Sequence, residues 1–147
     1  MYFAVVKNEH RLHPGVDIKL PERQTERSAG YDFYMPDNLL IAPHSSAKIA
    51  MDVKACVDDG YVLMLVPRSS TGKYPLYLCN TVGVIDGDYF ENPNNDGNIH
   101  LMFFNPTDEP VILQKGQRVV QGVFVKIGLC DDVVEKQRVG GMGSTDA

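Results

Sequence analysis

A carboxylate and an aromatic ring stand three positions apart in the short segment 83–89, at Asp86 and Tyr89. Apolar residues lead into this segment as a predicted strand, and Gly87 permits a sharp turn directly after Asp86. If the turn reverses the chain, both side chains can face one small pocket. A fixed carboxylate beside a flat apolar face suits the activation of a water molecule next to a ring-bearing substrate. Aspartate and glycine are also common at surface hairpin tips, so this segment alone leaves both interpretations open.

The elements that would position these residues are short strands. Thirteen glycines and nine prolines divide the chain into brief apolar runs, which are typical of a sandwich, jelly roll or barrel. One short helix is expected after Ser69 and Ser70, ending before Pro75. The sequence therefore predicts an all-β domain with strands at residues 2–6, 39–41, 47–53, 61–66, 76–78, 82–85, 99–104, 111–113 and 119–127.

Two of these predicted strands, 61–66 and 119–125, are apolar at nearly every position. An antiparallel strand with one solvated face alternates between apolar and polar residues instead. Both faces of these strands are therefore expected to be covered. Either a second subunit covers one face, or both are buried within a single sandwich.

The composition is that of a single globular domain. The 147 residues are 44% hydrophobic and 22% charged, which is enough for one sizeable core. The sequence shows neither an apolar run of about 18 residues nor a basic segment leading into an apolar one, so we expect no membrane span and no secretory signal. Cys56, Cys79 and Cys130 are too few and too scattered for a disulfide framework, which favours the cytoplasm, or the host cytoplasm for a viral protein.

The net charge of −5, without a visible basic face, disfavours direct nucleic-acid binding. A small anionic ligand remains compatible with this charge, because a few converging arginines reverse the local potential. Arg68, Arg118 and Arg138 are the candidates. The last begins a glycine-rich tail, 138–145, whose N–H groups and hydroxyls could wrap a phosphate chain and close as a lid. An ordinary disordered terminus is the alternative for that tail.

Five segments, taken in order, resemble the motifs of the trimeric deoxyuridine triphosphate nucleotidohydrolases (dUTPases). The resemblance runs from about Ala29 to Thr145 and implies a distorted jelly-roll subunit of the β-clip type that forms a homotrimer. Residues 1–137 would be the single domain, and residues 138–147 a flexible tail that closes an active site. The motifs are Ala29-Gly30-Tyr31-Asp32-Phe33, Pro67-Arg68-Ser69-Ser70-Thr71-Gly72, Asn80 with Gly83 to Tyr89, Gly116-Gln117-Arg118-Val119-Val120-Gln121, and Arg138 to Thr145.

The resemblance implies hydrolysis of dUTP to dUMP and pyrophosphate, by attack of water on the α-phosphorus. Such a reaction limits uracil incorporation into DNA and supplies dUMP for dTMP synthesis. Asp86 would be the general base, and Tyr89 would lie against the deoxyribose and reject ribonucleotides. Hydrogen bonds to the uracil edge would come from Asn80 and from the backbone of Gly83, Val84 and Ile85.

The remaining motifs would hold the triphosphate. In that family each site takes its first, second and fourth motifs from one chain, the third from a neighbour and the fifth from the remaining chain. A Mg²⁺ ion, mostly water-ligated, would bridge the phosphates, and Asp32 would act on its waters without direct coordination. The phosphate contacts would come from Arg68, Ser69, Ser70, Gly72 and Gln121, with Arg138, Ser144 and Thr145 closing over the γ-phosphate. Gly143 would also bind the substrate.

Departures from the family pattern leave some questions open. Met142 stands where the family usually places an aromatic residue that stacks on uracil, so lid closure is expected to be weaker. Residues 90–97 are longer than a tight hairpin needs, and form either a family-variant loop or a surface for a protein partner. A dCTP deaminase of the same fold is the nearest alternative enzyme, but its catalytic glutamate would fall at Met102, which cannot relay protons. A regulatory protein-binding module on the dUTPase fold is the alternative from another class.

Overall fold

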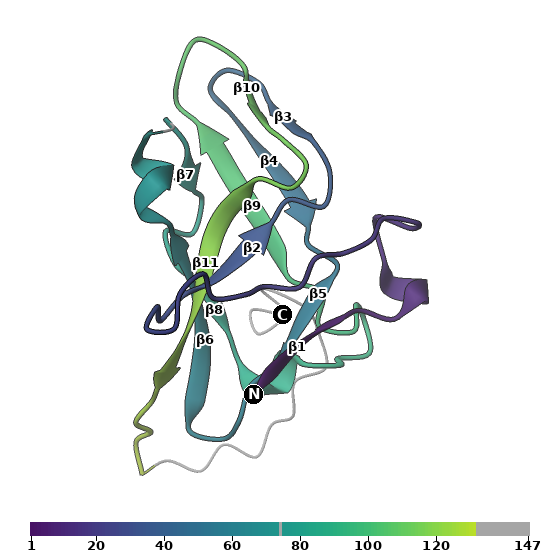
Figure 1. Ribbon diagram of the computed structural model, residues 1–147, viewed down its shortest axis with the longest axis vertical. Helices are drawn as coiled ribbons and strands as arrows, with labels where there is room; N and C mark the ends of the chain where they lie inside the picture. The colour runs from purple at the N-terminus through teal and green to yellow at the C-terminus, as the bar shows by residue number, and fades with distance from the viewer. Residues whose placement is uncertain (74, 132–147) are drawn as a thin grey trace.

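The computed structural model describes residues 1–73 and 75–131, and its strands all pair antiparallel. Three short 3₁₀ turns account for the helical structure of these residues. Figure 1 shows the elements in chain order from purple to yellow. They are β1 (Tyr2–Val5), η1 (Asn8–His10), β2 (Tyr31–Tyr34), β3 (Leu39–Ile41), β4 (Ser45–Ala50), β5 (Val53–Cys56), β6 (Tyr61–Pro67), η2 (Ser69–Lys73), β7 (Tyr77–Leu78), β8 (Gly83–Ile85), η3 (Gly87–Tyr89), β9 (His100–Asn105), β10 (Val111–Leu113) and β11 (Arg118–Lys126).

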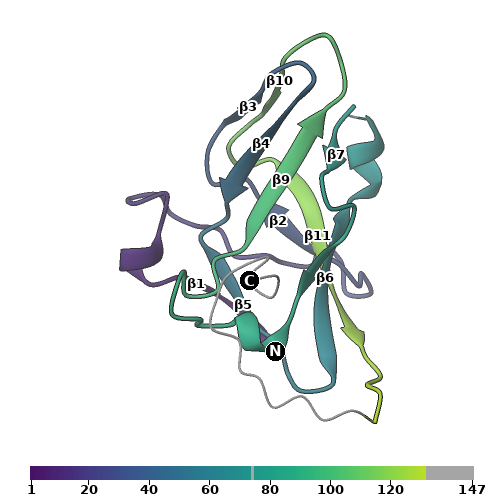
Figure 2. The same ribbon diagram turned by 180° about the vertical axis from the view of Figure 1, so that it is seen from behind.

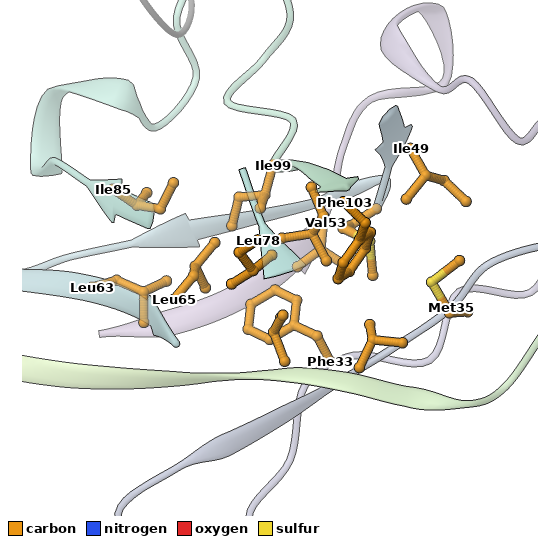
Figure 3. Close-up of a cluster of buried hydrophobic side chains, with 14 of the residues drawn as sticks. Phe33, Met35, Ile49, Val53, Leu63, Leu65, Leu78, Ile85, Ile99 and Phe103 are labelled. Atoms are coloured by element: carbon orange, nitrogen blue, oxygen red, sulfur yellow. The ribbon is translucent and has the colours of Figure 1, made fainter. Parts of the chain in front are cut away.

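The strands form four sheets that enclose one apolar core, which confirms the all-β jelly-roll class. The larger sheets have the orders β2-β11-β6-β8 and β4-β9-β7, and the smaller ones are the pairs β1-β5 and β10-β3. Figure 2 shows the same arrangement from behind. In Figure 3, side chains from both larger sheets point toward one another around Phe33 and Leu78. The two larger sheets thus share the core.

Strand alternation explains which residues enter this core. In β9, Leu101 and Phe103 are buried, whereas Met102 between them is 42% exposed. In β6, Leu63 and Leu65 are buried, so Met64 points to the opposite face. The register places Met64 between Val123 of β11 and Val84 of β8. This row of three apolar residues lies on the outer face, and Val84 is 57% exposed. The second apolar face expected from the sequence is therefore only partly covered within one chain.

Two parts of the sequence-based strand prediction were wrong. Residues 47–53 were expected to be one strand, but β4 ends at Ala50 and β5 begins at Val53. Asp52, in the turn between them, has φ 52°, a left-handed conformation that breaks the extended run. Strand β2 was not expected at all, because four residues containing a buried aspartate carry no clear apolar period. The short helix expected after the second motif is confirmed as η2, whereas η1 and η3 were not predicted.

Candidate active site

The first, second and fourth motifs converge on the buried carboxylate of Asp32. Arg68 Nε donates to Asp32 Oδ1 at 2.7 Å, and Arg118 Nη1 donates to Asp32 Oδ2 at 3.2 Å. This convergence follows from strand order, because β11 lies between β2 and β6, with Gln121 opposite both Asp32 and Val66. Both arginines therefore bind one carboxylate. The resulting cluster holds a positive group at a fixed place beside the η2 turn.

Hydrogen bonds within the η2 turn fix its conformation. Thr71 Oγ1 accepts a hydrogen bond from Arg68 N–H and donates one to the carbonyl of Val119 at 3.1 Å. Arg68 Nη1 also donates to Ser70 Oγ at 2.9 Å. Ser69 and Gly72 are exposed on the same turn. The turn thus presents hydroxyl groups and a guanidinium together, which is a suitable arrangement for binding an anion.

Gln121 reaches the same region because residue 30 is a glycine. A Cβ at Gly30 would collide with the Gln121 side chain. Gln121 Nε2 donates to the carbonyl of Pro67 at 3.2 Å. The glycine of the first motif therefore makes room for the glutamine of the fourth, and this places the Gln121 amide beside Arg68.

The third motif forms a separate pocket at the other side of β6. Cys79 follows β7, and its N–H donates to the carbonyl of Met102 in β9 at 2.9 Å. The chain then leaves the side of β9 and runs toward β8. The opening between β9 and β8 has an apolar floor and polar groups at its edge. Its lining consists of Leu65, Leu78, Asn80, Gly83, Val84, Ile85, His100 and Leu101. A flat ring with a polar edge suits such a pocket.

His100 is the pocket residue that sequence reasoning missed. None of the four histidines falls within the five sequence motifs. Burial, and then the nearby Lys48, lower the pKa of His100, while Asp52 raises it by a smaller amount. The imidazole is therefore neutral at neutral pH and has both a donor and an acceptor nitrogen. Its position near the start of the predicted strand 99–104 was the signal that could have identified it.

Asp86 and Tyr89 lie at the end of the β8 strand that forms one wall of this pocket. Tyr89 N–H donates to the carbonyl of Asp86 at 3.1 Å, which closes the η3 turn. Asp86 is exposed at an open concavity that Asp58, Asp59 and Asp88 also line. Tyr89 is 2% exposed, and its hydroxyl donates to the carbonyl of Asn98 at 2.6 Å.

Within one chain the two groups of residues are far apart. Ile85 pairs with Leu63, so Asp86 lies beside Val62 of β6, whereas Arg68 follows the opposite end of that strand. At about 3.3 Å per residue, this separation is about 20 Å. Figure 1 shows the coiled turn beside β7 and the one after β8 at opposite ends of β6. Asp86 and Arg68 of one chain therefore cannot both contact one triphosphate.

Comparison with known proteins identifies the family. The family model described as dUTPase matches residues 16–145. The chain belongs to the dUTPase family. Among curated relatives, the deoxyuridine 5'-triphosphate nucleotidohydrolase of Lactococcus lactis is 43% identical over 134 residues, 88% of this chain and 89% of that protein. A relative from Helicobacter pylori is 30% identical over 142 residues, 92% of each chain.

Solved structures show the same fold. The crystal structure of the dUTPase from Streptococcus mutans has a TM-score of 0.78 and 40% identity, covering 88% of this chain and 98% of that one. The dUTPase of Staphylococcus bacteriophage 80alpha has a TM-score of 0.68 at 22% identity, covering 93% of this chain and 97% of that one, and supports the fold alone. The resemblance inferred from the five motifs is thus confirmed.

The fifth dUTPase motif lies outside the described residues. Its predicted contacts, and the domain boundary at residue 137, remain predictions; the residues concerned are Arg138, Met142, Gly143, Ser144 and Thr145. Across residues 1–73 and 75–131, no group of three or more His, Cys, Asp or Glu side chains is arranged to hold a metal ion. In the same residues, no helix has the length and apolar character required to cross a bilayer.

Proposed function

We propose that this dUTPase hydrolyses dUTP to dUMP and pyrophosphate, with Asp86 as the general base that deprotonates the attacking water. The observation that carries the assignment is the position of an exposed carboxylate at the end of β8, the strand that also forms one wall of the pocket beside Asn80. A uracil held by Asn80 and the β8 backbone would extend its phosphates toward Asp86. A mismatched base would leave buried polar groups unpaired, which disfavours cytosine.

In this proposal the triphosphate is bound by Arg68, Ser69, Ser70, Gly72 and Gln121, and residues of the tail, 138–145, close over the γ-phosphate. General-base assistance gives about 10²–10⁴-fold, so positioning and charge stabilisation by these groups must supply most of the acceleration. We infer Mg²⁺ as the cofactor. Both oxygens of Asp32 already accept from arginines, which fits an ion held by phosphate and water rather than by a protein cage. The ion would neutralise charge on the triphosphate, with Asp32 beyond its water ligands.

An Asp86→Asn variant tests the assignment of the base. We expect hydrolysis to fall by about 10²–10⁴-fold, because the water is no longer deprotonated. Binding of the non-hydrolysable α,β-imido analogue of dUTP, measured by calorimetry, should stay within about twofold, because the amide is isosteric. Asp59→Asn, at the same concavity, is the matched control and should retain activity. Hydrolysis by Asp86→Asn at the rate of the control would refute the role of Asp86.

We propose that the active unit is a homotrimer. The separation of Asp86 from Arg68 requires that one site combine residues of different chains, and the exposed outer row at Val84 offers an apolar contact surface. A mixture of two inactive variants, Asp86→Asn and Arg68→Ala, tests this after dissociation and reassembly. About a quarter of the sites would then combine an intact Asp86 with an intact Arg68 from another chain. No recovery of activity, or a sedimentation mass of one chain, 16.3 kDa, would contradict the shared site.

The alternatives make different predictions in one assay. A dCTP deaminase would release ammonia from dCTP, whereas this chain should release pyrophosphate from dUTP and leave dCTP intact. The comparisons do not favour the deaminase, and by resemblance to the deaminases their catalytic glutamate would fall at Met102, which cannot transfer protons. A protein partner would make regulation a second role beside catalysis. Free cysteines at positions 56, 79 and 130 support our placement of the enzyme in the reducing cytoplasm.

A further inference from the structure

The loop after Tyr89 holds the hydroxyl of that residue. Tyr89 Oη donates to the carbonyl of Asn98 at 2.6 Å and accepts from Asn95 Nδ2 at 2.8 Å. Asn95 is itself oriented, because its Oδ1 accepts from Asn92 Nδ2 at 2.7 Å and from Gly97 N–H at 3.1 Å. Residues 90–98 thus fold back over the side chain of Tyr89, the residue that precedes the loop.

The loop approaches Tyr89 as closely as the backbone allows. Gly97 has φ +79°, and a Cβ there would lie 2.8 Å from the carbonyl oxygen of Tyr89. Asn92 Nδ2 donates to the same carbonyl at 3.1 Å. Asn92 and Asn98 are 5% and 1% exposed, so the amides that fix this loop are inside the protein. The loop is a buried support and presents little surface to a partner at these positions.

Asp52 connects the loop to the N-terminal segment. Asn98 and Asp52 bond reciprocally: Asp52 N–H donates to Asn98 Oδ1 at 3.0 Å, and Asn98 Nδ2 donates to Asp52 Oδ1 at 2.9 Å. The backbone N–H groups of Leu12 and His13 both donate to the Asp52 carboxylate at 2.9 Å. Asn98, whose carbonyl accepts the hydrogen bond from the Tyr89 hydroxyl, is therefore linked through Asp52 to the N-terminal segment at Leu12 and His13.

We propose that Asn95 and Asn98 are positioning residues for sugar selection, acting through the Tyr89 hydroxyl. This inference rests on the proposed function and on the role that the family resemblance implies for Tyr89, exclusion of a 2′-hydroxyl by contact with the deoxyribose. Steric exclusion is only as selective as the excluding wall is rigid, because a ring that can tilt away makes room for the extra oxygen. Two hydrogen bonds at the far end of the ring oppose such a tilt.

An Asn95→Ala variant tests the proposal by measuring kcat/KM for dUTP and UTP. We expect the preference for dUTP to fall by about three- to tenfold, the effect of losing one hydrogen bond, mainly through better use of UTP. Tyr89→Phe should give a similar loss. The double variant should be no worse than Tyr89→Phe alone, because the two changes remove the same interaction. Asn94→Ala, an exposed amide in the same loop, is the matched control and should keep the wild-type preference.

The possible results separate this proposal from the function on which it rests. An unchanged preference in Asn95→Ala, with lower thermal stability, would show a merely structural role and overturn the proposal. Strictly additive losses in the double variant would also overturn it. Tyr89→Leu tests the ring itself, and an unchanged preference there would remove Tyr89 from sugar selection altogether. A wild-type chain that neither hydrolyses dUTP nor binds its α,β-imido analogue would refute the proposed function, and this inference with it.

Discussion

Replacing Asp32 with asparagine tests whether this carboxylate orients Arg68. The pair is largely buried, with side-chain exposures of 7% for Asp32 and 18% for Arg68, so its hydrogen bond belongs to the class worth about 1.5–3 kcal/mol. In the second pair, between Asp32 and Arg118, the Arg118 side chain is 41% exposed, so this pair adds about 0–1 kcal/mol. Asparagine keeps an acceptor for Arg68 but turns an N–H₂ toward Arg118, so part of the larger interaction survives. The expected destabilisation is about 2 kcal/mol.

Thermal unfolding and steady-state kinetics together measure this effect. A loss of about 2 kcal/mol corresponds to a fall of about 4–8 °C in Tm for a chain of this size. The KM for dUTP should rise by about tenfold, because the guanidinium loses its orienting partner, while kcat changes less. Asp17→Asn, an exposed aspartate of the N-terminal segment, is the matched control. Wild-type Tm and KM in Asp32→Asn would show that the Asp32–Arg68 pair orients nothing, and the reasoning would be wrong.

Three further predictions concern the supports of the site. Asp96→Asn should destabilise the protein by about 3 kcal/mol in denaturant unfolding, because Lys54 would lose a buried charged partner. Lys54 Nζ lies 2.9 Å from Asp96 Oδ2, and the Lys54 side chain is 6% exposed. A loss below about 1 kcal/mol would contradict this reasoning. Burial raises the pKa of both Asp52 and Asp96, but other contacts outweigh it and hold each pKa below the ordinary value. At Asp52 these contacts are hydrogen bonds from Leu12, Asn98 and His13. At Asp96 they are the Lys7 N–H and the Lys54 ammonium. The contribution of these two carboxylates to stability is therefore full above about pH 4 and is lost as pH falls through the lowered values; unfolding midpoints measured from pH 7 to pH 2 should show this, and a flat profile would count against it. Gly97→Ala should cost about 1–3 kcal/mol through its left-handed backbone and the contact with Tyr89, and wild-type stability in that variant would show that the loop can move aside.

The sequence predicted the chemistry of the site better than its layout. Short motifs encode local turns and side-chain types, so local structure is the part of the site that a sequence can predict. The turn around Arg68 and the pocket beside Asn80 are examples of such local structure. The distance between Arg68 and Asp86 could not be predicted from spacing, because it depends on which strands pair across β6.

The fold was predictable where apolar runs are bounded by turn residues. Strands β3 and β10 were predicted to the residue, because each is a run of three apolar residues between polar or turn-forming segments. The boundary between β4 and β5 was missed because it depends on the positive φ of Asp52, which its buried hydrogen bonds stabilise. Those bonds join residues far apart in the sequence, and no local pattern reports them.

The supports of Tyr89 also have a consequence for the order in which the protein folds. Lys7 N–H bonds Asp96, 89 positions away in the sequence, and Asn98 bonds Asp52, 46 positions away. The entropy cost of closing such long loops must be met by sheets that have already formed, so these contacts are expected to form late. Once its sheets are complete, the chain would therefore have the pocket for the base before it has the contacts that hold the Tyr89 side chain rigidly in place.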